Sequence, residues 1–376
     1  MGARMAYLEA QRRDLADLAE RSRARRLSAR TGRDFASNDY LALAGDPALA
    51  GTVRAAIEAG VPIGSGGSRL LRGNHVEHER LEAAAAGFFG AESALYFSTG
   101  YAANAALLST LPQRGDLIVH DALVHASAHE GMRLSRAEAR GAAHNDPDAF
   151  DDAVAAWRAG GGTGRVWVAV ESLYSMDGDR APLDALAEIA DRHEAILLVD
   201  EAHATGVFGP EGRGLAAGLA GSANLITLHT CGKALGCEGA LLCGPRVMRD
   251  FLVNRGRAFI FSTAPSPLMA VAVEAALGLI ARSERRERLH ELVGRAEALL
   301  APVGVRATGS QILPLVLGDD ARTMAMAAEL QRLGFDVRGI RPPTVPAGTS
   351  RLRISLTLNV DEADVAALAE AIGSLA

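Results

Sequence analysis

The sequence predicts an α/β fold, in which a large domain with a mostly parallel sheet is followed by a smaller α+β domain. From Ala94 onward, short apolar runs alternate with segments of helical periodicity, as in a sheet covered by helices on both faces. After about Ser266 this alternation gives way to a long helical stretch and scattered shorter elements. We therefore expect an N-terminal arm over residues 1–45, a large domain over 46–265 and a small domain over 266–376.

The individual elements follow from periodicity and from the residues that bound each run. Strands are expected at Ala94–Ser98, Leu117–His120, Arg165–Val170, Ala195–Val199, Leu225–His229 and Ala240–Cys243. Helices are expected at Ala102–Leu111, Asp148–Ala159 and Leu183–His193, then at Leu268–Leu300, Arg322–Leu333 and Asp361–Leu375, with a strand at Ile312–Leu317 and two more after Leu333. Ligands gather beyond the carboxyl ends of parallel strands, so we look for the chemistry there.

The composition is that of a globular protein with a substantial core, since 49% of the 376 residues are hydrophobic. A net charge of −6 argues against a general cationic surface for nucleic acid. We expect the Arg-rich stretch Arg21–Arg33 to be the solvated face of an N-terminal helix, although it could also meet an anionic substrate such as a CoA thioester. No apolar run reaches the ~18 residues of a membrane span, and Met1–Arg13 is too polar for a signal peptide, so a cytoplasmic location is expected.

The three cysteines are clustered and odd in number, which argues against a disulfide framework and fits a reducing compartment. Their even spacing does not resemble a zinc site, and small buried residues are the expected interpretation. They are Cys231, Cys237 and Cys243.

Three polar residues follow two of the expected strands. Asp200 comes directly after one strand with His203 three residues later, and Lys233 lies in a glycine-flanked loop after the next strand. Alone, the lysine could be a solvated surface residue, and the carboxylate could be a metal ligand or a general base. Together they indicate pyridoxal 5′-phosphate (PLP), which needs an amine for a Schiff base and an anion that keeps its ring nitrogen protonated. A metal site on Asp200 and His203 lacks a third ligand at a suitable spacing.

Two further segments suit the same cofactor. The turn Phe97–Tyr101 opens a helix, and backbone N–H groups at a helix N-terminus favour a phosphate, although many such turns contain glycine. Three histidines, His120, His125 and His129, could suggest a metal, but one imidazole stacked on the cofactor ring suffices. We favour His125 because it should begin the next helix, and we expect the other two to be structural.

Taken in order, six segments resemble the α-oxoamine synthase family of fold-type-I PLP enzymes, from about Ser37 to the C-terminus. Any one of them could be chance, and their order and spacing carry the resemblance. The segments are Ser37–Leu41, Gly64–Ser68, Ser98–Asn104, Glu171–Asp179, Asp200–His203 and Thr230–Lys233.

The resemblance implies a role for each matching residue. Lys233 would form the Schiff base, Asp200 would pair with the pyridinium, and His203 would hydrogen-bond the phenolic oxygen. His125 would stack on the ring. The remaining implied residues are Ser175 and Asn38 near cofactor or substrate, Gly100, Tyr101 and Thr230 on the phosphate, and Ser262 and Thr263 on the phosphate of the neighbouring subunit of a homodimer.

The C-terminal segments Arg341–Gly348 and Arg351–Ser355 point, by resemblance, to a member that condenses L-alanine with a pimeloyl thioester of CoA or acyl carrier protein in biotin synthesis. Alternation along the second segment puts Arg351 and Arg353 on one side, and similarity selects Arg353 as the clamp for the amino-acid carboxylate. Without the resemblance, they would be an exposed arginine pair.

Alternatives stay open. A sibling enzyme would use glycine or serine with another acyl-CoA, a silent PLP-fold subunit would only bind a partner, and a metalloenzyme would use Asp200 and the histidines. The segment that holds Arg69 and Arg72 departs from the pattern of some relatives. The sequence therefore leaves open which acyl chain the pocket would accept.

Overall fold

The computed structural model describes residues 8–375, and the chain divides into two compact units. The small unit comprises Met1–Ser37, Met176–Gly178 and His290–Ala376, and the large unit comprises Asn38–Ser175 and Asp179–Leu289. This division follows contacts within the fold. The domain boundaries expected from the sequence, after residues 45 and 265, remain a proposal.

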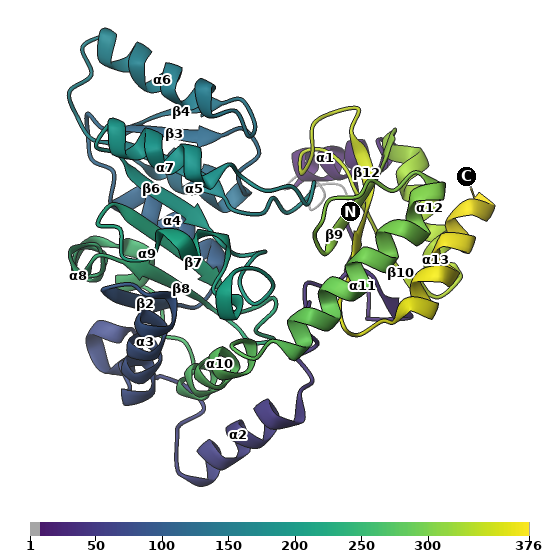
Figure 1. The fold of residues 1–376 in the computed structure, drawn as a ribbon, viewed down its shortest axis with the longest axis horizontal. Helices are drawn as coiled ribbons and strands as arrows, with labels where there is room; N and C mark the ends of the chain where they lie inside the picture. The colour runs from purple at the N-terminus through teal and green to yellow at the C-terminus, as the bar shows by residue number, and fades with distance from the viewer. Residues whose placement is uncertain (1–7, 376) are drawn as a thin grey trace, which may run out of the picture. The chain divides into compact units, whose positions relative to one another are not determined.

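The large unit is built on a seven-stranded sheet with the order β2-β8-β7-β6-β5-β3-β4 (Figure 1). β8 runs antiparallel to β2 and β7, and the other neighbours pair in parallel. The strands are β2 (Ser93–Phe97), β3 (Leu117–Asp121), β4 (Glu138–Ala142), β5 (Val166–Glu171), β6 (Ile196–Asp200), β7 (Leu225–Thr230) and β8 (Ala240–Gly244). The mostly parallel sheet expected from the alternating pattern is therefore present.

β4 is the strand of this seven-stranded sheet that the sequence analysis missed. Its residues, Glu-Ala-Arg-Gly-Ala, contain no apolar run, and most of them are exposed because β4 lies at an edge of the sheet. The central strands β5 and β7 are buried at every position, which gives the apolar runs that made them predictable.

Helices cover both faces of this sheet. Residues of α4 (Gly100–Thr110), α5 (Ala126–Leu134) and α8 (Arg246–Arg255) share one apolar cluster with alternate strand residues such as Leu198. The intervening residues, such as Leu197, pack with α6 (Pro147–Ala159) and α7 (Leu183–Arg192) on the opposite face. The unit also contains α2 (Pro47–Glu58), α3 (Val76–Phe89), a π-helical turn (Arg69–Gly73), α9 (Arg257–Ile260) and α10 (Pro267–Ile280).

The small unit contains an antiparallel sheet of order β11-β12-β9 and a two-stranded parallel pair, β1 and β10. Its strands are β9 (Ile312–Gly318), β11 (Arg338–Ile340), β12 (Ser350–Ser355), β1 (Arg33–Asp34) and β10 (Phe335–Asp336), and its helices are α1 (Glu9–Glu20), α12 (Asp320–Arg332) and α13 (Glu362–Leu375).

Two expectations for helices were wrong. The stretch Leu268–Leu300 is not one helix, because α10 ends at Ile280 and α11 begins at Glu284. Ser283, which favours a helix N-cap, and Glu284, which favours a first turn, explain this new start. The stretch Arg21–Arg33 is not a helix face either. α1 ends at Glu20 and irregular chain follows, in which Arg23 pairs with Asp320 at 2.7 Å.

Among residues 8–375, no helix has the length and apolar character needed to cross a membrane.

Candidate active site

Lys233 lies in the loop between β7 and β8, where its amine meets a chain of hydrogen bonds. Its Nζ is 2.7 Å from Nε2 of His203, and Nδ1 of His203 is 2.6 Å from the hydroxyl of Tyr40. Tyr40 in turn donates to Oδ1 of Asn38 at 3.0 Å. The structure thus brings together Lys233, His203 and Asn38, three residues selected from the sequence, through Tyr40, which was not selected.

The direction of this chain defines the tautomer of His203. Because the single proton of the Tyr40 hydroxyl goes to Asn38, its oxygen accepts from Nδ1–H of His203. The other ring nitrogen, Nε2, is then an acceptor that faces the amine of Lys233. His203 is buried, which protects this arrangement from water.

Asp200 ends β6 and is held by two donors. Its Oδ2 accepts from Nδ2 of Asn104 at 2.8 Å, and its Oδ1 accepts from the backbone N–H of Ala202 at 3.0 Å. These two donors hold the carboxylate in place at the end of β6. Asn104, a buried residue of α4, was present in a quoted motif but had no role assigned from the sequence.

His125 is the N-cap residue of α5, as expected for a residue that begins that helix. Its Nδ1 accepts from the backbone N–H of Ser127 at 3.2 Å and lies 2.8 Å from the Ser127 hydroxyl, which also contacts Nδ2 of Asn104 at 3.0 Å. Burial lowers the pKa of His125 and Lys233 lowers it further, against the opposite effect of Asp200. The imidazole of His125 is therefore neutral and solvent-accessible, so a cofactor ring could stack flat against it.

A possible phosphate site lies where α4 begins. Thr99 caps the helix by accepting from the N–H of Ala102, and a Cβ placed on Gly100 would lie 3.5 Å from Oγ1 of Thr230. The N–H groups of the first turn and the Thr230 hydroxyl therefore lie next to each other, at the positive end of the helix dipole. Tyr101, also in the first turn, is half exposed.

Three of the other predicted residues lie in the large unit and one in the small unit. Ser175 is buried after β5, and its backbone N–H hydrogen-bonds Glu171. Ser262 and Thr263 are exposed in the segment after α9. Arg353, on β12 of the small unit, is buried and donates from Nη1 to Oγ of Ser355 at 2.5 Å.

Arg351 and Arg69 have structural partners. Arg351 contacts Oδ1 of Asp177 through Nη1 at 2.6 Å within the small unit, so it is not an exposed strand arginine. Arg69 forms a buried two-point ion pair with Glu82, at 2.8 and 3.1 Å, while Arg72 is exposed. The ion pair explains why a buried arginine is tolerated there.

Glu171 and Glu201 are buried carboxyl groups next to this site whose roles the sequence analysis did not identify. Glu171 ends β5, beside Asp200, and Glu201 accepts from the N–H groups of Leu215 and Ala216 and from the hydroxyl of Ser172. Burial raises the pKa of Glu171 to about 8 and that of Glu201 to about 7. In the sequence, each of these two glutamates stands at the carboxyl end of an apolar run, and this position is the signal that could have identified them.

In the described part of the chain, the three cysteines and the histidines His120 and His129 are not arranged as ligands of a metal ion. Cys231 and Cys243 are buried and Cys237 is partly buried, all as free thiols. The rings of His120 and His129 pack edge to face, with centroids 5.1 Å apart. Within the described part of the chain, no three His, Cys, Asp or Glu side chains gather so that they could hold a metal ion.

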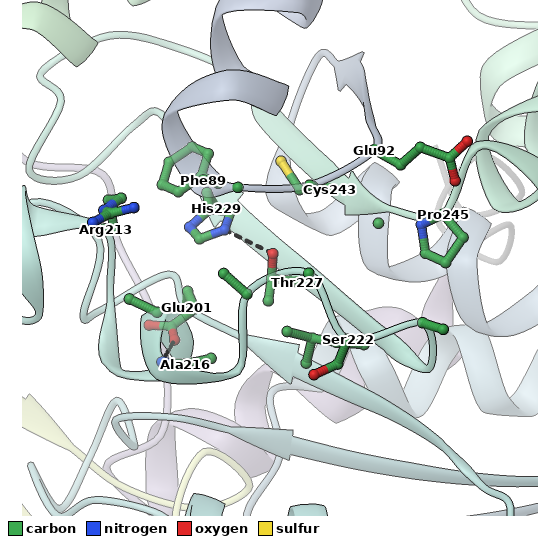
Figure 2. Close-up of a pocket in the computed structure, with 18 residues that line it drawn as sticks. Phe89, Glu92, Glu201, Arg213, Ala216, Ser222, Thr227, His229, Cys243 and Pro245 are labelled. Atoms are coloured by element: carbon green, nitrogen blue, oxygen red, sulfur yellow. Dashed lines mark hydrogen bonds between the residues drawn. The ribbon is translucent and has the colours of Figure 1, made fainter.

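A separate cavity of about 230 Å³ in the large unit has a lining that includes Glu201 and His229, two buried side chains with hydrogen-bond partners (Figure 2). His229 stacks on Phe89, with ring centroids 3.5 Å apart, and its nitrogens lie 2.8 and 2.9 Å from the hydroxyls of Thr227 and Thr205. Burial lowers the pKa of His229 to about 3, so the ring is neutral. We interpret this histidine as a structural core residue.

The residues around Lys233 fit PLP. An amine and a hydrogen-bonded carboxylate follow adjacent parallel strands, a neutral imidazole lies near them, and a helix N-terminus with a hydroxyl is available for the phosphate. Asn104, His125, Glu171 and Asp200 also line one small cavity. These are the groups that an aldehyde cofactor with a basic ring nitrogen and a phosphate requires.

Comparisons with known proteins agree with this geometry. The family model of aminotransferase class I and II matches residues 31–372. A curated 8-amino-7-oxononanoate synthase of Chromobacterium violaceum is 46% identical over 330 residues, which cover 86% of this chain and 84% of the relative.

Solved structures give the same picture. A structure of serine palmitoyltransferase (SPT) with PLP matches with a TM-score of 0.87 at 28% identity, covering 99% of this chain and 97% of that one. An 8-amino-7-oxononanoate synthase of Francisella tularensis matches with a TM-score of 0.77 at 27% identity, covering 91% and 97%.

Proposed function

The chain belongs to the aminotransferase class I and II family and, within it, to the 8-amino-7-oxononanoate synthases, and from this premise we propose its reaction. It is a PLP-dependent C-acyltransferase that condenses L-alanine with a pimeloyl thioester. The products are 8-amino-7-oxononanoate, carbon dioxide and the free thiol, and the pathway is biotin synthesis. The observation that carries this proposal is the joint placement of Lys233, His203 and Asp200 at the strand ends of a chain so similar to these synthases.

The bound cofactor supplies an aldehyde that captures amines and a protonated ring that accepts the electron pair left when a proton leaves the amino acid. Lys233 would hold the cofactor through its amine, and the same amine would remove the proton from the Cα of alanine. His203 keeps the amine of Lys233 in place through the 2.7 Å contact and would face the phenolic oxygen. Asp200, to which Asn104 and Ala202 donate hydrogen bonds, would hold the proton on the ring nitrogen.

The remaining groups are proposed to bind and orient. The α4 N-terminus with Gly100, Tyr101 and Thr230 would hold the phosphate, and His125 would pack on the ring. Ser175 and Asn38 would border cofactor or substrate. Arg353 is proposed as the carboxylate clamp, because a buried guanidinium offers two parallel donors. After losing its proton to Lys233, alanine Cα would form a bond to the thioester carbonyl carbon as the C–S bond breaks and the thiol leaves. The β-keto acid would then lose carbon dioxide, and Lys233 would return the proton to Cα.

We also propose a homodimer, and an apolar patch supports it. Ile63, Leu71 and Phe261 are 76%, 84% and 72% exposed, and they lie in segments joined by a hydrogen bond from the N–H of Ala264 to the carbonyl of Gly67. Three large apolar side chains with this degree of exposure favour a protein–protein interface at this surface. Ser262 and Thr263 lie in the same segment, from which they are proposed to reach the phosphate bound by the partner subunit.

A cytoplasmic location is proposed from the three free thiols. The acyl donor is proposed to be a thioester of CoA or of acyl carrier protein.

Mass spectrometry of the products tests the reaction. The purified protein is incubated with PLP, pimeloyl-CoA and equal amounts of alanine, glycine and serine. We expect a product with the mass of decarboxylated pimeloyl-alanine. A product built from glycine or serine would assign the chain to a sibling reaction. No pimeloyl product, from a protein that still binds PLP through Lys233, would refute the proposed acyl donor. A parallel reaction with pimeloyl-acyl carrier protein compares the two carriers.

A further inference from the structure

Glu171 is a buried carboxyl group that the proposed reaction does not use. It is the last residue of β5, is 3% exposed, and stands in register with Asp200 on the adjacent parallel strand β6. Residues in register on neighbouring parallel strands point to the same face of a sheet, and the strands are ~4.8 Å apart. Two carboxyl groups therefore share one side of the site, and both line the cavity that also contains His125 and Asn104.

The surroundings of the two carboxyl groups differ. Asp200 accepts hydrogen bonds from the amide of Asn104 and from a backbone N–H. Glu171 receives the backbone N–H groups of His125 and Ser175, but its Oε1 is buried without a hydrogen-bond partner in the described part of the chain. Two adjacent carboxylates cannot both be charged at low cost away from water. The better solvated of the two, Asp200, should keep the charge.

We propose that Glu171 is a positioning residue that remains a neutral carboxylic acid at physiological pH. One of its oxygens holds the N–H groups of His125 and Ser175, and its lack of charge leaves Asp200 as the anion that faces the ring nitrogen. The protonation state is a property of this chain alone, and only the link to the ring nitrogen depends on the proposed function.

The electrostatics of the neighbouring groups support this assignment. Burial raises the pKa of Glu171 to about 8 and Asp200 adds to the effect, while Lys233 and the two N–H groups oppose it. Tyr174, in the chain after β5, also senses Glu171, and burial holds the pKa of its hydroxyl far above the usual value. Among the groups that act on Glu171, Lys233 is the cation and Asp200 is the anion.

The protein without cofactor provides the first test. Because the pKa of Glu171 is raised from 4.5 to about 8 on folding, its protonation favours the folded state fully below pH 4.5, and this advantage is lost as the pH rises toward about 8. Glu171→Gln removes the titrating group and keeps an acceptor for the two N–H groups. We expect the melting temperature of Glu171→Gln, relative to wild type, to increase steadily from pH 5 to pH 8.

Glu201→Gln is the matched control. Glu201 is equally buried, but both of its oxygens accept hydrogen bonds, so an amide would turn donors against donors. This variant should be less stable than wild type at pH 5, and because the pKa of Glu201 is raised to about 7, its stability difference should stop changing above about pH 7. A stability difference for Glu171→Gln that does not change between pH 5 and pH 8 would refute the neutral state of Glu171.

The second test uses the loaded enzyme. At pH 7, Glu171→Gln should retain the cofactor affinity and keep kcat within about threefold of wild type, while Glu171→Leu, which offers no acceptor, should weaken cofactor binding by about tenfold or more. A loss of more than about tenfold in kcat for Glu171→Gln at pH 7 would mean that the charge matters and would overturn the proposal. If wild type makes no pimeloyl product, the proposed function fails, whereas the stability test still decides the state of Glu171.

Discussion

The amine of Lys233 lies at one end of a hydrogen-bonded chain through His203 and Tyr40 to Asn38. Each link restricts the next, because the Tyr40 proton fixes which nitrogen of His203 carries hydrogen. Lys233 is proposed both to hold the cofactor and to move a proton, and both roles require that its amine keeps one position. This series of hydrogen bonds therefore explains how the site can orient the long, flexible side chain of Lys233.

Replacing Lys233 with alanine should remove both functions of the amine. We expect turnover to fall by more than about 10³-fold and the visible absorbance of lysine-bound PLP to disappear. Absorption spectra and product assays check this, with thermal unfolding of the cofactor-free variant as the control for folding. A Lys233→Ala protein with normal activity would refute the assignment.

Tyr40→Phe tests the chain behind His203. The variant keeps the packing of the ring but removes the hydroxyl that Nδ1 of His203 contacts, so the imidazole is less firmly held with Nε2 toward Lys233. We expect kcat to fall by about tenfold and the pH profile of kcat to shift, with little change in the KM for alanine. A rise in KM at constant kcat would instead indicate that Tyr40 acts in substrate binding.

At the scale of elements, His144 ties strand ends to a loop within the large unit. Its Nδ1 is 2.9 Å from Oδ1 of Asp121 at the end of β3, and its Nε2 is 2.8 Å from Oδ2 of Asp179. Burial acts to lower the pKa of His144, but the hydrogen bonds and charges of Asp121 and Asp179 outweigh it and raise the pKa to about 10. The positive imidazolium thus joins two acidic residues.

His144→Gln should destabilise the protein in a pH-dependent way. Since the pKa rises on folding from 6.5 to about 10, the stabilisation is complete below pH 6.5 and is lost as the pH rises through about 10. We expect a loss of about 2 kcal/mol near pH 6, because partial exposure of His144 and Asp179 reduces the full effect. Urea unfolding at several pH values measures it.

His193→Gln is the control for that experiment. His193 contacts a single carboxylate, Asp151, at 2.6 Å and lies beside α6. Its replacement should cost clearly less than that of His144. If the two variants lose the same free energy of unfolding, the pairing of His144 with two carboxylates stabilises the fold no more than the pairing of His193 with one.

At the scale of the whole molecule, the proposed homodimer depends on the apolar patch around Phe261. Phe261→Asp places a charge in that patch, and burying it in an interface without a partner would be costly. We expect the variant to be monomeric by light scattering at concentrations where wild type is dimeric. Its PLP affinity should also fall, because Ser262 and Thr263 would no longer reach the partner's phosphate.

Val247→Asp is the control for the dimer. Val247 is 74% exposed on α8, outside the patch, so this variant should have the oligomeric state of wild type. A dimeric Phe261→Asp, or a wild-type monomer with full activity, would contradict the proposed assembly.

The predictability of the fold from the sequence varied with burial. The six expected strands of the large unit agree with the structure to within one residue at each end, because most are buried on both faces and appear as continuous apolar runs. The edge strand β4 lacked that signal and was missed. The break between α10 and α11 was missed as well, because residues 281–288 contain no Gly or Pro and only the capping residues mark the boundary.

The sequence by itself determined the fold class, the family and the residues whose chemistry is local in the chain: Asp200 and His203 after one strand, and Lys233 after the next. Only the tertiary structure decided what stands behind them, since Tyr40 meets His203 across 163 residues and Asn104 meets Asp200 across 96. The reason is physical. A local pattern records backbone periodicity and burial, whereas the state of a buried proton, as on Glu171, depends on every group that the fold packs around it.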